Sequence, residues 1–74
     1  MTFETLAYIQ QLLKLEEDTA KRNLTTRQQR LDALYDADAP SEEIEEAITF
    51  KRIAVRHHTD ALRALTEFNN HDWR

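Results

Sequence analysis

The chain has 74 residues with a single proline, Pro40, and no glycine. Tight turns between strands and the loops that cradle phosphates depend on glycine, so its absence argues against a sheet protein and against P-loop or Rossmann sites. Pro40 lies in segment 36–41, which also holds two aspartates and a serine. These residue types favour turns, and proline interrupts a helix. The segment is the one strong break in the chain, and it divides the sequence into two long halves.

Both halves carry apolar residues at the spacings of three, four and seven that are typical of helices. Upstream these are Leu6, Ile9, Leu13, Ala20, Leu24, Leu31 and Leu34; downstream they are Ile44, Ala47, Ile48, Ala54, Val55, Ala61, Leu62, Leu65 and Phe68. Glu42 and Glu43 suit a helix N-terminus after Pro40, and Asn69-Asn70 suits a C-terminus. The pattern predicts one all-α domain over 1–74, with helices at about 3–35 and 40–69, a turn at about 36–39 and a short C-terminal tail. Such a short connection requires an antiparallel hairpin.

A hairpin of this size buries only a small core, and it needs a further source of stability. Disulfides and thiolate metal sites are excluded because the chain has no cysteine. Tyr8, Leu12 and Leu15 project away from the first apolar stripe, and Phe50 and Ile53 lie off the second, so one partner helix cannot cover them all. We therefore expect a homodimeric four-helix bundle or a higher symmetric oligomer. The predicted self-association interface is Leu6, Ile9, Leu13, Leu62, Leu65 and Phe68. The alternative is a monomer with scattered exposed apolar residues.

The net charge is −4, but the charges are segregated along the chain. Residues 36–46 hold six acids and no base, whereas the hairpin would bring the cations of 21–35 and 47–64 to the same level. These cations form a predicted basic belt around the middle of the rod: Lys21, Arg22, Arg27, Arg30, Lys51, Arg52 and Arg56. Acids four residues away compensate part of the belt, and Glu45 or Glu46 lies within reach of Arg27 and Arg30 across the hairpin. The belt is a solvated face, a set of salt bridges to the acidic turn of a second copy, or a docking site for a nucleic-acid backbone or an acidic protein.

His58 falls in phase with the apolar stripe of the second helix and should meet the acidic segment 16–18. Three interpretations are open: a polar layer with a carboxylate, exposure to water, or a metal site doubled by dimer symmetry. Metal sites in helix bundles show Glu-x-x-His, whereas the residues three before His57 and His58 are Ala54 and Val55.

Catalytic constellations are not visible in the sequence. The acids of 42–46 have no second acidic cluster downstream, serine occurs once, and cysteine never occurs. No loop is long enough to build a small-molecule site. We therefore expect no enzymatic activity, no small-molecule substrate, no metal and no cofactor.

The layout resembles the Rop-type antiparallel hairpins, which dimerise and bind paired RNA loops. The similarity is one of architecture and assigns no residue. The leading hypothesis is a small non-enzymatic interaction module, an adaptor or regulator that docks another protein on a helical face. The alternative is a Rop-like nucleic-acid-binding dimer that uses the basic belt. No apolar run exceeds four residues, so we expect no membrane span and a cytoplasmic location.

Overall fold

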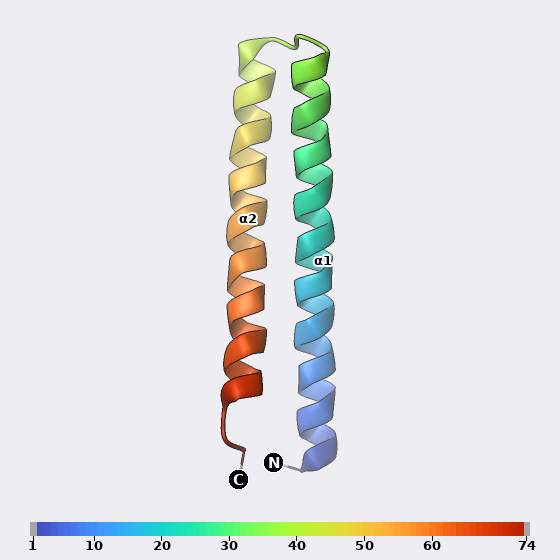
Figure 1. The fold of residues 1–74 in the computed structure, drawn as a ribbon, viewed down its shortest axis with the longest axis vertical. Coiled ribbons are helices and arrows are strands. Elements are labelled where there is room, and N and C mark those ends of the chain that lie inside the picture. Colours follow the sequence, from blue (N-terminus) through green and yellow to red (C-terminus); the bar gives the residue numbers. More distant parts are fainter. Residues whose placement is uncertain (1, 74) are drawn as a thin grey trace.

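The computed structural model describes residues 2–73. Helices α1 (Phe3–Asp36) and α2 (Ser41–Asn70) lie side by side and antiparallel, with the turn at one end of a rod that measures 55 × 14 × 12 Å (Figure 1). The predicted all-α antiparallel hairpin is confirmed, and each helix limit lies within one residue of its predicted position. The packing of two hairpins into a four-helix bundle stays a prediction.

The two helices begin differently. The hydroxyl of Thr2 accepts a hydrogen bond of 3.2 Å from the backbone N–H of Thr5, which satisfies one of the free donors in the first turn of α1. Pro40 immediately precedes α2 and provides no side-chain cap, but its carbonyl accepts bonds from the N–H groups of Glu43 and Ile44. The fixed φ of proline therefore directs the chain into α2 from the flanking position, and the helix begins at Ser41, one residue after its predicted start.

The turn between the helices contains a left-handed residue that is not glycine. Asp38 has a φ of +50°, in the left-handed region that aspartate tolerates better than most residues. The N–H of Asp38 bonds the carbonyl of Tyr35 at 3.2 Å, and the N–H of Ala39 bonds the carbonyl of Leu34 at 3.0 Å. This is the Schellman arrangement that ends many helices, with aspartate at the usual glycine position.

Alanine residues bring the helices together. Ala47, Ala54 and Ala61 lie seven residues apart on α2 and are buried, and Ala54 is completely inaccessible. Leu31 is the other buried residue within 2–73. The half-buried residues on the same line of α2 are Ile44, Lys51, His58, Leu65 and Phe68. We call this contact line between the helices the seam. Small side chains permit close approach of the backbones, but they remove little apolar area from water.

Candidate interaction surfaces

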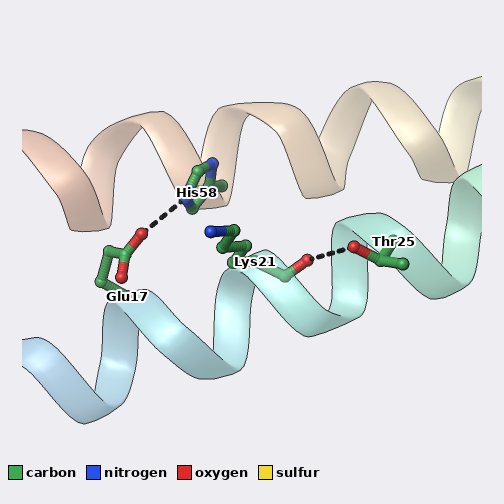
Figure 2. A network of polar contacts seen from close by, with 4 residues as sticks. All are labelled: Glu17, Lys21, Thr25 and His58. Carbon is green, nitrogen blue, oxygen red and sulfur yellow. Dashed lines mark hydrogen bonds and ion pairs between the residues drawn. The ribbon is translucent and has the colours of Figure 1, made fainter.

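A polar pair lies in the seam, in the middle of the rod. His58 Nε2 lies 2.8 Å from Glu17 Oε1, and both side chains are largely covered (Figure 2). Lys21, one turn further along α1, extends back toward the pair. The hydrogen bond with His58 holds the pKa of Glu17 below its ordinary value, against the opposing effect of partial burial. The structure thus supports the polar layer among the three interpretations of His58.

His58 has no cluster of further metal ligands around it in the described residues. No group of three or more His, Asp or Glu side chains within 2–73 is placed to hold a metal ion. At the open end of the rod, Gln10 Nε2 donates a 2.8 Å hydrogen bond to Asn69 Oδ1. Together with Glu17–His58, this bond fixes the register of the two helices.

Two flanks lie on either side of the seam. At 100° per residue, positions 48, 55 and 62 of α2 lie about 80° to one side of the seam, and positions 50, 57 and 64 lie about 80° to the other. We call the first the stripe flank, after Ile48, Val55 and Leu62, and the second the groove flank. Antiparallel packing adds to each flank the corresponding residues of α1.

A wide groove of about 680 Å³ runs along the groove flank in the half of the rod away from the turn. Small side chains form its floor, including Ala20, Ala61 and Ala64. Its lining is completed by Leu12, Leu15, Glu16, Thr19, Asn23, His57 and Asp60. Two exposed apolar side chains of α2, Ile53 and Phe50, follow on the same flank toward the turn, and Ile53 is 55% exposed. The groove flank therefore carries a hollow and a protrusion next to each other.

The turn end of the groove flank holds two cations of the predicted belt. Arg27 lies over the ring of Phe50, 5.1 Å from its centroid. Arg27 and Arg30 line one hollow with Glu43 and Glu46, so two acids lie in their neighbourhood. The predicted partner Glu46 is present, whereas Glu45 lies on the other side of α2.

The stripe flank combines aliphatic residues with cations. Val55 and Leu62 are 42% and 45% exposed. Toward the turn, a hollow of about 480 Å³ is lined by Leu31, Tyr35, Ile48, Lys51, Arg52 and Val55. On α1, Lys14 and Lys21 directly follow the half-buried residues Leu13 and Ala20 of the seam. They therefore lie at the border of the same flank. Lys51 and Arg52, two cations of the predicted belt, thus lie beside an apolar stripe.

The basic belt surrounds the rod and does not converge on one face. Lys21 and Arg52 belong to the stripe flank, Lys51 lies at the edge of the seam beside that flank, and Arg27 and Arg30 belong to the groove flank. Arg22 lies midway between Ala20 and Leu24, and Arg56 lies midway between Ala54 and His58. A residue midway between two contact positions four apart faces away from the neighbouring helix, so both arginines point outward. Within residues 2–73, no lysine or arginine lies within ion-pair distance of a carboxylate, and His58, beside Glu17, is the one basic side chain there that does.

The residues predicted for self-association occupy mainly the seam. Five of them are half-buried at the open end of the hairpin, and Leu62 is exposed: the five are Leu6, Ile9, Leu13, Leu65 and Phe68. Trp73 folds back near them, where its ring lies 4.9 Å from that of Phe68 and its Nε1 donates to the Phe68 carbonyl. Most of the apolar surface left for a partner is therefore made of other residues.

Comparison of the chain with protein-family models, with curated proteins and with solved structures finds no match. Neither helix has a stretch that is long and apolar enough to cross a membrane within 2–73.

Proposed function

We propose that this protein is a small non-enzymatic interaction module that self-associates and docks a partner protein on a helical face. The observation that carries the proposal is the imbalance between core and surface. Ten large apolar or aromatic side chains within 2–73 are at least 40% exposed, whereas the buried set consists of one leucine and three alanines. Exposed apolar patches on this scale mark interaction sites in soluble proteins.

The total surface area supports the same proposal. A folded monomer of 8.8 kDa exposes about 4,800 Å² by the usual scaling with mass. This chain exposes 6113 Å². Its radius of gyration is 16.8 Å, against about 11 Å for a compact domain of the same length. A rod with this much uncovered surface is better suited to be one part of an assembly than a finished globule.

The stripe flank is the docking face for a partner protein. Ile48, Val55 and Leu62 repeat every seven residues, which is the spacing that the apolar face of a partner helix matches. Lys14, Lys21 and Lys51 border the stripe on the side of the seam, and Arg52 borders it on the outer side. Cations on both borders favour acidic residues on the edges of the partner helix. An acidic amphipathic helix is therefore the partner chemistry that this flank fits.

Affinity capture with variants of the exposed stripe tests this proposal. We expect the wild-type protein to retain an acidic helical protein from its source cells, and Val55→Glu to lose it. Gln29→Glu adds the same charge on the outer side of α1 and should retain the partner. Capture of the same proteins by Val55→Glu and by wild type would refute docking on the stripe.

Nucleic-acid binding by the belt is the competing function. Phosphate contacts need cations that converge along a backbone path, and this belt divides its cations among both flanks and the outer sides. Arg27 and Arg30, moreover, share their hollow with two glutamates. We therefore expect no gel shift with mixed RNA or DNA at about 50 mM salt and tens of micromolar protein, where electrostatic binding is strong. A shift that disappears near about 200 mM salt would favour the Rop-like alternative.

A further inference from the structure

We infer that the wide groove is filled by a second copy of this chain, packed antiparallel about a two-fold axis so that Ile53 of each copy lies over Ala64 of the other. The inference rests on the proposed self-association and specifies its face, direction and register. The face is the groove flank, opposite to the stripe proposed for the partner protein.

Shape is the first support. Ile53, His57, Asp60 and Ala64 follow one another at spacings of four, three and four, so they lie along one side of α2. Ile53 protrudes at the turn-proximal end of this line, and Ala64 forms part of the groove floor at the other end. When the second copy runs antiparallel to the first, its Ile53 lies over the hollow at Ala64 of the first copy. The Ile53 of the first copy then lies over the hollow at Ala64 of the second. Each chain thus carries both halves of a self-complementary contact, as a two-fold interface requires.

Symmetry and charge agree with this register. The axis that pairs residue 53 with residue 64 passes between residues 58 and 59, and it also pairs His57 with Asp60. An imidazole then faces a carboxylate twice across the interface. On α1 the same axis passes at the level of the Glu17–His58 bond. The two His57–Asp60 pairs bring no like charges together, so on α2 the register carries no repulsive penalty.

The available area is sufficient for a stable dimer. Two separate copies expose about 12,200 Å², whereas an ordinary folded protein of twice the mass exposes about 7,900 Å². The difference of about 4,300 Å² is an upper value for the area that two such rods could bury on association. It lies within the range of about 2,000–5,000 Å² that obligate homodimers bury. Leu12, Leu15 and Phe50 lie along the same flank and supply apolar contact on either side of the axis.

Disulfide cross-linking tests the register directly, because the natural chain contains no cysteine. We expect an oxidised mixture of Ile53→Cys and Ala64→Cys to give a cross-linked heterodimer, while neither variant cross-links alone. The matched control is a mixture of Val55→Cys and Leu62→Cys. These positions are symmetric about the same level of α2 but lie on the stripe flank, so this mixture should stay uncross-linked.

A second variant measures affinity. We expect Ile53→Arg to raise the dimer dissociation constant by about tenfold or more, and Leu62→Arg to leave it unchanged. Cross-linking of the stripe pair in place of the groove pair would overturn the inferred face while leaving self-association intact. Failure of the groove pair to cross-link in a protein that sediments as a dimer would overturn the register. A wild-type monomer would refute self-association itself.

Discussion

Glu17 and His58 form a polar contact in a seam whose buried residues within 2–73 are alanines and one leucine. A paired polar group inside a packed contact specifies one register, because any sliding of the helices leaves both groups without their partner. The sequence placed His58 opposite the acids of 16–18. It could not select Glu17, because the three acids differ only by rotation about the helix, and side-chain packing decides which one faces the seam.

The lowered pKa of Glu17 predicts acid-sensitive stability. A carboxyl whose pKa is lower in the folded chain than in the unfolded chain contributes stability above the unfolded pKa. That contribution is lost as the pH falls through the folded pKa. We expect the free energy of unfolding of wild type to exceed that of Glu17→Gln at neutral pH, with the difference shrinking below about pH 4.5. Chemical denaturation of both proteins across pH 3–7 measures it, and Glu67→Gln, at an exposed position of α2 outside the groove, is the control. A difference that is independent of pH would contradict the role of the Glu17 charge.

At the scale of elements, the sequence predicted the helices and their limits, but it did not predict the backbone conformation and the capping bond at their ends. Periodicity and Pro40 located each limit within one residue. The left-handed Asp38 was not predicted, because a position that needs positive φ is usually signalled by glycine. The Thr2 cap was also missed, since one threonine before a helix is a weak signal beside a long apolar repeat.

Asp38 provides a test of the turn. We expect Asp38→Val to lower the free energy of unfolding by about 1–2 kcal/mol, because a β-branched residue clashes in the left-handed region. Asp38→Gly, which is free of that clash, should retain stability. Thermal or urea denaturation followed by circular dichroism measures both. Equal stability of the valine and glycine variants would show that the turn does not require this conformation.

Ala54 tests the close approach of the helices. We expect Ala54→Leu to lower the free energy of unfolding by about 1–3 kcal/mol, because the seam has no room for the larger side chain. The same substitution at exposed Ala33 should change it by less than about 0.5 kcal/mol. If Ala54→Leu were neutral or stabilising in urea denaturation, the seam would be looser than the structure indicates.

At the scale of the whole molecule, the sequence predicted surplus apolar surface, and most of the residues that it assigned to self-association are half-buried between the two helices of one chain. Leu6, Ile9 and Leu13 repeat with the helical period, and a contact inside a hairpin requires the same period as a contact between two hairpins. The apolar repeat therefore could not distinguish residues of the seam from residues of a dimer interface. The residues left exposed, such as Leu12, Leu15 and Ile53, become recognisable as a second surface only once the seam is defined.

The two flanks differ in chemistry, and we propose a different role for each. We infer that the groove flank is self-complementary, whereas the stripe flank carries lysines beside aliphatic residues. A dimer closed through the groove would leave both stripes exposed on opposite sides of the assembly. Such a dimer would present two equivalent docking faces, so it would join two partner chains.

Sedimentation equilibrium of the wild-type chain at about 10–100 µM tests self-association most directly, since a stable dimer of micromolar or tighter affinity is populated there. We expect a mass of twice 8.8 kDa, falling toward that of one chain for Ile53→Arg and unchanged for Leu62→Arg. A mass of 8.8 kDa for wild type throughout this range would contradict the dimer and the interface inferred from the groove.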